Sequence, residues 1–310
     1  MVRVMAESTA PKARRLAARL CRVATRRSNQ LRDFSRLVAL PHTVFSLPFA
    51  LGAAVIAGTR AAPPLTHYLW IVVAVAAART AAMAFNRYVD RDIDAKNPRT
   101  QDRELPRGQV TATSALVLTV AAAGVFELAA WRLGRLPLAL SLIALVVCLG
   151  YSFSKRFTAF PHLVLGLALA GAPAGAWVAI TGSFSLAALA LSVAVLAWVA
   201  GFDIIYSCQD VAFDRRQRLG SVPARWGVAV ALRLSAVLHV VTVVGLVLFG
   251  SLLSLGLIYF VGVGAIVATL VYEHRIVSPT DLSRVNRAFF TLNGYVSLLF
   301  FACTLVEALS

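Results

Sequence analysis

The sequence predicts an all-α fold, a polytopic transmembrane bundle of about nine helices. Apolar residues make up 59% of the 310 residues and charged residues only 14%, against about 25% charged residues in an ordinary soluble domain. Mean hydropathy is +0.76, and apolar runs recur along the whole chain. These observations exclude a disordered chain, a fibrous protein and a typical water-soluble enzyme, because one soluble core cannot bury so many long apolar runs.

A helix needs about 20 mostly apolar residues to cross the hydrocarbon core of a bilayer. Nine segments of the chain have this length and character. The predicted spans are residues 37–58, 67–88, 112–131, 137–154, 161–181, 185–206, 228–249, 253–272 and 287–308.

The positive charges agree with nine spans. Of the 30 Lys and Arg residues, 26 then fall on one side of the membrane, whereas the other side carries only Arg60, Arg132 and Arg135. The positive-inside rule predicts a multi-pass protein of the cell (inner or plasma) membrane, with a cytoplasmic N-terminus and an extracytoplasmic C-terminus. A net charge of +16 would indicate nucleic-acid binding in a soluble protein. Here topology accounts for it, and we expect no nucleic-acid partner.

The chain divides into a tail and a membrane domain. Residues 1–36 carry ten Lys and Arg and are predicted to be a basic cytoplasmic tail, although a lipid-bound surface helix or a transit peptide would have a similar composition. Residues 37–308 are predicted to form the nine-helix domain. The four cysteines match no zinc-site or disulfide spacing.

Two acidic clusters share one spacing, 120 residues apart. They read Asn86-x3-Asp90-x3-Asp94 and Tyr206-x3-Asp210-x3-Asp214. Each begins at the same side of a predicted span and precedes a basic loop. Residues at i, i+4 and i+8 share one stripe of an α-helix, so each cluster is predicted to present its two aspartates on one face. Asp92 and Asp102 fit solvated loop charges better.

Carboxylates at a membrane boundary need compensating charge. An Asp at the centre of a span costs about 2.5–3.5 kcal/mol on insertion scales, and a desolvated acidic cluster without cations protonates. Oxygen ligands suit Mg²⁺, which commonly binds through one or two carboxylates plus substrate phosphates. The two aspartate pairs therefore predict two Mg²⁺ ions that hold a diphosphate. Nearby groups predicted to contact its remaining oxygens are Arg99, Arg103, Tyr151, Lys155, Arg156, Arg215 and Arg216.

Three further features leave alternatives open. Arg79 lies seven residues before Asn86, on roughly the same stripe, and either reaches the cavity or pairs with a neighbouring helix. His42 either contacts a substrate or is a structural histidine. Gly171-x3-Gly175 is predicted to permit close helix packing rather than to take part in chemistry.

These residues resemble the UbiA superfamily of intramembrane prenyltransferases over about residues 37–308. The family's first motif, Asn-Asp-x2-Asp-x3-Asp, and its second, Asp/Tyr-x3-Asp-x3-Asp, match the two acidic clusters. The family's Arg-x3-Arg-x-Leu-Pro-x-Gly loop matches Arg99, Arg103, Leu105, Pro106 and Gly108, and its Tyr-x3-Lys-Arg element matches Tyr151, Lys155 and Arg156.

The resemblance implies a helical bundle whose central cavity opens to the cytoplasmic side and laterally to lipid. It implies that Asp90, Asp94, Asp210 and Asp214 bind Mg²⁺ and prenyl diphosphate, with Asn86 and Tyr206 assisting. The implied activity is transfer of a polyprenyl group to an aromatic acceptor, a dihydroxynaphthoate or a hydroxybenzoate, in the synthesis of a respiratory quinone. Arg79 and Arg87 are then candidates for binding an anionic acceptor, and Phe45 and Phe49 for contacting the isoprenoid tail.

Two departures refine the resemblance. Arg87 replaces the usual Asp of the first motif, and Glu104 replaces a frequent Pro. Together with the segment 41–50 and the Gly201–Tyr206 element, these two residues look closer to the prenyltransferases of the futalosine branch of menaquinone synthesis than to those of ubiquinone synthesis. Prenylation of a haem, chlorophyll or polar-lipid acceptor is an alternative. A cation-coupled transporter is an alternative from another class, although transporter sites usually lie near the bilayer midplane, not at one boundary.

Overall fold

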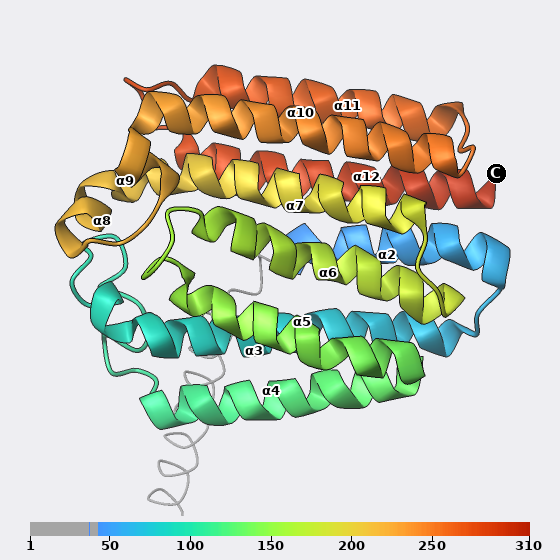
Figure 1. Cartoon of the computed structure of the whole chain (residues 1–310), viewed down its shortest axis with the longest axis horizontal. Coiled ribbons are helices and arrows are strands. Elements are labelled where there is room, and N and C mark those ends of the chain that lie inside the picture. Colours follow the sequence, from blue (N-terminus) through green and yellow to red (C-terminus); the bar gives the residue numbers. More distant parts are fainter. Residues whose placement is uncertain (1–36, 38–42) are drawn as a thin grey trace, which may run out of the picture.

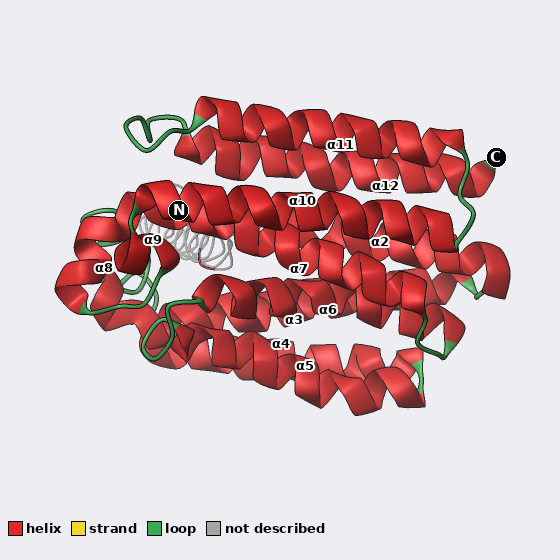
Figure 2. Cartoon of the chain, turned by 45° about the horizontal axis from the view of Figure 1, so that its top comes forward, coloured by secondary structure: helices red, strands yellow, loops and turns green. Residues whose placement is uncertain are grey.

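The computed structural model describes residue 37 and residues 43–310. The predicted basic tail, residues 1–36, and the candidate His42 lie outside the described residues. The described part is built of helices joined by loops (Figure 2). The prediction of an all-helical membrane bundle is confirmed.

The observed helices follow the predicted spans closely. They are α2 (Thr43–Ala61), α3 (Leu65–Asp94), α4 (Ala112–Leu133), α5 (Arg135–Ser154), α6 (Pro161–Thr181), α7 (Leu186–Ser207), α10 (Val228–Leu252), α11 (Leu257–Ile276) and α12 (Asn293–Leu309). Short helices η2 (Cys208–Asp210), α8 (Val211–Gln217) and α9 (Val222–Trp226) follow α7, and the π-helix η3 (Arg287–Leu292) precedes α12. Within the described residues, eight helices are long and apolar enough to cross a membrane, and α2 adds a shorter apolar segment, Phe45–Ala61.

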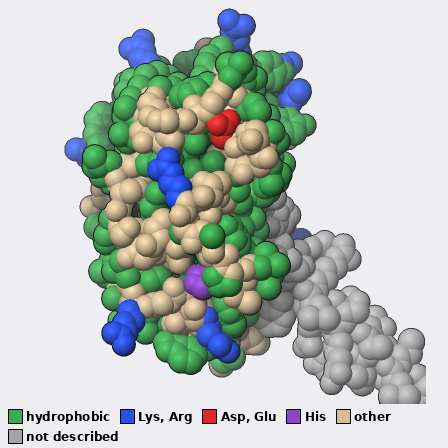
Figure 3. Space-filling view, turned by 90° about the vertical axis from the view of Figure 1, so that its right-hand side faces the viewer, with side chains coloured by type: hydrophobic (Ala, Val, Ile, Leu, Met, Phe, Trp, Pro, Cys, Tyr) green, Lys and Arg blue, Asp and Glu red, His purple; other side chains and the backbone are tan. Residues whose placement is uncertain are grey.

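The long helices lie side by side along one axis (Figure 1). Helices α8 and α9 and the loops 95–111 and 155–160 gather at one end of the bundle, which we call the polar end. The C-terminus lies at the opposite end, whose surface is mostly apolar or uncharged with scattered charged side chains (Figure 3). Both acidic motifs therefore lie at the same end of the molecule.

Local signals set several helix ends. The side chains of Thr111, Ser185 and Ser221 accept hydrogen bonds from backbone N–H groups in the first turns of α4, α7 and α9, which satisfies donors that a helix start leaves unpaired. Gly182 ends α6 with a φ of 69°, a conformation that glycine adopts without strain. Each helix pairs its own backbone groups, as a segment in lipid must.

An aromatic cluster fills the centre of the bundle, where α7 packs against α6 and α10. Trp198 is fully buried and lies 4.9 Å from Phe49 and 5.1 Å from Phe202 between ring centroids. Phe45 contacts the same rings and is 3% exposed. Phe45 and Phe49 therefore belong to the packed core and do not line the apolar cavity described below, and their contact with an isoprenoid tail stays a prediction.

The structure differs from the predicted elements at two places. The span predicted at 253–272 begins only at Leu257, because Ser254 adopts a φ of 54° and ends the preceding helix. The second acidic motif does not lie on one continuous α-helix. Helix α7 ends at Ser207, and Asp210 adopts φ −101° and ψ 4° before α8 begins. Asp210 and Asp214 are thus aimed by the bend between the helices and not by a helical stripe.

Candidate functional site

A polar cavity of about 190 Å³ lies at the polar end of the bundle. All four motif aspartates line it, from α3, the α7–α8 bend and α8: Asp90, Asp94, Asp210 and Asp214. Other predicted residues in its wall are Asn86, Arg99, Arg103, Tyr151, Lys155 and Tyr206. The tertiary fold therefore brings two motifs that lie 120 residues apart to one cavity.

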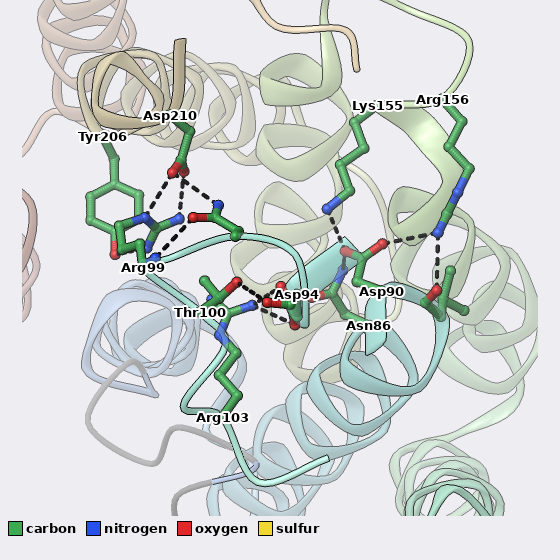
Figure 4. A network of polar contacts seen from close by, with 12 residues as sticks. Asn86, Asp90, Asp94, Arg99, Thr100, Arg103, Lys155, Arg156, Tyr206 and Asp210 are labelled. Carbon is green, nitrogen blue, oxygen red and sulfur yellow. Dashed lines mark hydrogen bonds and ion pairs between the residues drawn. The ribbon is translucent and has the colours of Figure 1, made fainter. Parts of the chain in front are cut away.

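Asp90 is held by two cations from the segment that follows α5 (Figure 4). Lys155 Nζ lies 2.6 Å from Asp90 Oδ2, and an Arg156 guanidinium nitrogen lies 3.1 Å from Asp90 Oδ1. Asn86, one helical turn earlier, donates a hydrogen bond of 3.1 Å to Asp90 Oδ2. The carboxylate is only 3% exposed, so these contacts supply the compensation that a buried charge requires.

Asp94 and Asp210 have one arginine each from the loop that follows α3. Arg103 contacts both carboxylate oxygens of Asp94, at 2.7 and 2.8 Å. Arg99 donates from Nε to Asp210 Oδ1 at 2.9 Å and from a second nitrogen to the hydroxyl of Tyr206 at 2.9 Å. Burial acts to lower the pKa of Arg99, but its hydrogen bond to Asp210 and the neighbouring acidic groups outweigh burial and raise that pKa. Arg99 therefore stays charged.

Asp214 has a different kind of partner. Ser221, the N-cap of α9, donates a hydrogen bond of 2.8 Å to Asp214 Oδ2. The segment Gly220–Val222 is fixed in turn by the backbone N–H of Gly220, which donates to the carbonyl of Lys155 at 2.6 Å. The segment that positions Asp214 therefore also contacts Lys155, which in turn holds Asp90.

The oxygen donors of this cavity fit Mg²⁺. They are the four carboxylates and the side-chain amides of Asn86 and Asn97, the ligand types that a hard cation prefers. Within the described residues, no three His, Cys, Asp or Glu side chains converge closely enough to hold a metal by themselves. Binding through fewer carboxylates plus phosphate oxygens agrees with this arrangement. Among the described residues, none forms a hydrogen bond with the buried side-chain hydroxyl of Ser152, in the same wall.

An apolar cavity of about 440 Å³ lies between α3, α4, α5 and α6 and shares Asn86 and Tyr151 with the polar cavity. Its lining is almost entirely apolar, with Arg79 as its one charged side chain. Arg79 Nε is buried and has no hydrogen-bond partner within the described part of the chain. The structure therefore favours the alternative in which Arg79 reaches a cavity over the one in which it pairs with a neighbouring helix.

The prediction for Gly171 and Gly175 is wrong. A Cβ atom at either position would meet nothing within 4 Å, because both glycines line the apolar cavity. Close helix packing occurs instead at Gly166, where a Cβ would collide with the backbone carbonyl of Leu196 in α7. A spacing of small residues indicates a smooth helix face, and only the packing decides whether a helix or a cavity covers it.

Several predicted residues lie outside the polar cavity. Arg215 donates to the backbone carbonyl of Ala224 in α9 and does not line the cavity. Arg156 does not line it either and acts on it through Asp90. Arg87, the second candidate for the acceptor, lines neither cavity, and its buried Nε has no hydrogen-bond partner in the part of the chain that the structure describes.

The cavity wall also contains polar residues that were not predicted, among them Asn97, His162, Asp203 and Ser221. Asn97 donates to Asp210 Oδ1 at 3.2 Å, beside Arg99. Asp203 precedes Tyr206 by three residues, within the Gly-Phe-Asp-x2-Tyr element, and this proximity to the motif was the available signal. The sequence around His162 offered no signal.

Comparisons with known proteins identify the family. The model of the UbiA prenyltransferase family matches residues 46–299. The chain belongs to the UbiA prenyltransferase family. The resemblance read from the two acidic motifs and the two loop elements is thereby confirmed.

Two relatives and two solved structures illustrate the match. The chain is 32% identical over 251 residues to a 4-hydroxybenzoate octaprenyltransferase of Nitrosospira multiformis, covering 80% of this chain and 84% of the relative. It is 31% identical over 239 residues to the protein of that name from Aeromonas salmonicida, covering 77% and 82%.

The apo structure of a UbiA homolog from Aeropyrum pernix K1 is similar with a TM-score of 0.78 and 35% identity, covering 86% of this chain and 98% of that one. A UbiA homolog from Archaeoglobus fulgidus bound to DMAPP and Mg²⁺ shares the fold at a TM-score of 0.70 and 22% identity, covering 89% and 99%. This UbiA-family chain therefore spans nearly the full length of its solved neighbours.

Proposed function

We propose that this protein catalyses Mg²⁺-dependent transfer of a polyprenyl group from a prenyl diphosphate to an aromatic acid. The observation that carries the proposal is the junction of two unlike cavities. The polar cavity, lined by aspartates and cations, shares Asn86 and Tyr151 with an apolar cavity inside the bundle. A prenyl diphosphate has the matching pair of ends, an anionic head and a hydrocarbon tail.

The head of the donor is assigned to the polar cavity. Asp90, Asp94, Asp210 and Asp214 are the residues that would hold two Mg²⁺ ions, and bound Mg²⁺ supplies electrostatic stabilisation of the diphosphate charge. Lys155, Arg99 and Arg103 each contact one of these carboxylates. With substrate bound, these cations are positioned to contact diphosphate oxygens instead. Tyr206 orients Arg99 through the hydrogen bond that its hydroxyl accepts.

The reaction begins when the bond between the allylic carbon and the diphosphate oxygen breaks and its electron pair leaves with the diphosphate. Cations aimed at the leaving group lower this barrier, because they are preorganised where negative charge develops. The allylic carbocation must be kept from water. The apolar walls between α3 and α6 serve that purpose, and a ring carbon of the acceptor then attacks and loses its proton to a basic oxygen of the polar cavity.

Arg79 is the residue assigned to the acceptor. It places a guanidinium group in the apolar cavity, and its buried Nε has no hydrogen-bond partner among residues 37 and 43–310. A carboxylate matches a guanidinium in charge and geometry. The names of the relatives support a hydroxybenzoate acceptor. Arg87 and Glu104 instead resemble the corresponding residues of prenyltransferases that act on a dihydroxynaphthoate derivative in menaquinone synthesis. A respiratory quinone precursor is the product in both cases.

We also propose the topology of the protein in the cell membrane. The 26 Lys and Arg on one side of the nine spans assign the polar end to the cytoplasm under the positive-inside rule. The basic tail, residues 1–36, then lies in the cytoplasm and the C-terminus outside. Cysteine accessibility on either side of intact cells tests this orientation.

The test of the function incubates membranes containing the protein with Mg²⁺, a series of prenyl diphosphates and a panel of aromatic acids. Mass spectrometry of the lipid extract identifies donor and acceptor together. We expect a prenylated aromatic acid that disappears in EDTA and in Asp90→Ala and Asp210→Ala variants that still insert into the membrane. Full activity in EDTA would refute the metal assignment.

The competing class is a cation-coupled transporter, since carboxylates inside membranes also mark ion pathways. Proteoliposomes distinguish the two. Cation flux without any prenyl substrate would favour transport, whereas Mg²⁺-dependent product formation without flux supports the enzyme.

A further inference from the structure

His162 lies in the wall of the polar cavity but belongs to neither acidic motif. It is the second residue of α6 and is 1% exposed. Its Nδ1 lies 2.7 Å from Oδ2 of Asp203 on α7. The Asp203 side chain is 18% exposed against 2% for His162, and both line the cavity. The carboxylate therefore faces the cavity more openly, and the imidazole lies behind it.

The hydrogen bonds of His162 define its tautomer. The backbone N–H of Val222 donates to Nε2 of His162 at 3.3 Å. An N–H group can only donate, so Nε2 must carry a lone pair, and the ring proton is on Nδ1, where it donates to Asp203. Both ring nitrogens are thus used, and the imidazole is neutral. Asp90, Asp94 and Asp210 each pair with a Lys or Arg side chain, whereas His162 is the side chain that pairs with Asp203 among the described residues.

The contact with Val222 connects His162 to the segment Gly220–Val222. Val222 follows Ser221, which donates to Asp214, and Gly220, which donates to the carbonyl of Lys155. A Cβ at position 220 would collide with the carbonyl of Thr158, so this segment is seated tightly on the loop between α5 and α6. His162 joins three parts of the site: Asp203, the segment that fixes Asp214, and the loop that carries Lys155.

We propose that His162 is a positioning residue of the diphosphate cavity, which orients the Asp203 carboxylate and docks the segment Gly220–Val222. The inference rests on the proposed function, because Asp203 and Asp214 act only if the cavity holds a diphosphate. A histidine that orients a carboxylate through a hydrogen bond behaves like the outer partner of a metal or ligand site, whose loss typically costs about 10–100-fold in affinity or activity.

The test uses the full chain in lipid nanodiscs with His162→Ala, His162→Asn, Asp203→Ala and the double variant His162→Ala/Asp203→Ala. The readouts are kcat and KM for a prenyl diphosphate, and calorimetric binding of an unreactive thio analogue of prenyl diphosphate with Mg²⁺. Thr242→Val is the control, since Thr242 is buried in α10 and bonds only its own helix.

We expect His162→Ala to weaken analogue binding and kcat/KM by about 10–100-fold. We expect His162→Asn to recover part of the loss, because its amide nitrogen lies near the position of Nδ1 and can donate to Asp203. The double variant should lose little more than the worse single variant, as expected for residues acting as one unit.

Three results would overturn the inference. The first is wild-type binding and kinetics in His162→Ala, and the second is additive losses in the double variant. The third is a fall in unfolding temperature like that of Thr242→Val with analogue binding intact, which would mean a purely structural histidine. Failure of the proposed function is distinguishable, since the wild-type protein would then neither bind the analogue nor transfer a prenyl group.

Discussion

The ammonium group of Lys155 lies 2.6 Å from Oδ2 of Asp90, although 65 residues separate them in the sequence. Asp90 lies near the end of the long helix α3, and Lys155 directly follows α5, so only the packing of α3 beside α5 brings them together. The pair places an ammonium group on a carboxylate proposed to bind metal. At this point a diphosphate in the cavity would lie beside both a carboxylate proposed to bind metal, Asp90, and an ammonium group that pairs with anions, Lys155.

Lys155→Ala is expected to lower prenyl transfer by about 10²-fold, which is the usual effect of removing one electrostatic contact to a leaving group. The measurement is kcat in nanodiscs at saturating Mg²⁺. Arg107→Ala is the control, since Arg107 forms an exposed pair with Asp102 outside the cavity and such pairs contribute little. Equal activity of Lys155→Ala and Arg107→Ala would contradict the role given to Lys155.

Arg79→Ala is expected to raise the KM for the aromatic acid by about tenfold or more, because a charge-assisted hydrogen bond contributes roughly 1.5–3 kcal/mol. The KM for the prenyl diphosphate should change little, since Arg79 lines only the apolar cavity. Initial rates with each substrate varied in turn separate the two constants. Arg135→Ala, in the first turn of α5 and outside the lining of both cavities, is the control. A rise confined to the KM of the diphosphate would assign Arg79 to the donor.

Gly171→Phe is expected to shift the enzyme toward short prenyl donors. A side chain at this position enters the apolar cavity, where a Cβ meets nothing within 4 Å. Competition between a long and a short prenyl diphosphate, followed by mass spectrometry, measures the change. Gly124→Phe is the matched control, because Gly124 also has open space around a Cβ but is exposed on the outer surface of α4. An unchanged product ratio in Gly171→Phe would place the tail elsewhere.

Gly166→Ala and Gly175→Ala form a pair that tests helix packing. A Cβ at Gly166 collides with the carbonyl of Leu196, whereas one at Gly175 meets open space. Overpacking of this kind typically costs about 1–3 kcal/mol. We therefore expect a lower unfolding temperature for Gly166→Ala alone, followed by intrinsic fluorescence in detergent. Similar unfolding temperatures for the two variants would show that α6 and α7 separate easily.

Much of this molecule was predictable because the relevant signals are local. The apolar length of each span follows from the thickness of the bilayer, and carboxylates beside such spans are costly enough to indicate a site. The predicted spans 112–131 and 161–181 agree closely with α4 and α6. The two spaced aspartate motifs predicted a shared site at one end of the bundle, and all four aspartates line one cavity.

The remaining features depended on which surfaces meet, and no local pattern records that. Phe49, predicted to contact an isoprenoid tail, packs against Trp198 in the core, whereas Gly171, predicted to pack against a helix, lines the apolar cavity. His162 gave no signal, because its partners Asp203 and Val222 are 41 and 60 residues away. Spacing along the chain determines which residues a single helix presents together, but contacts between helices arise from the packing of the whole bundle, which only the tertiary structure decides.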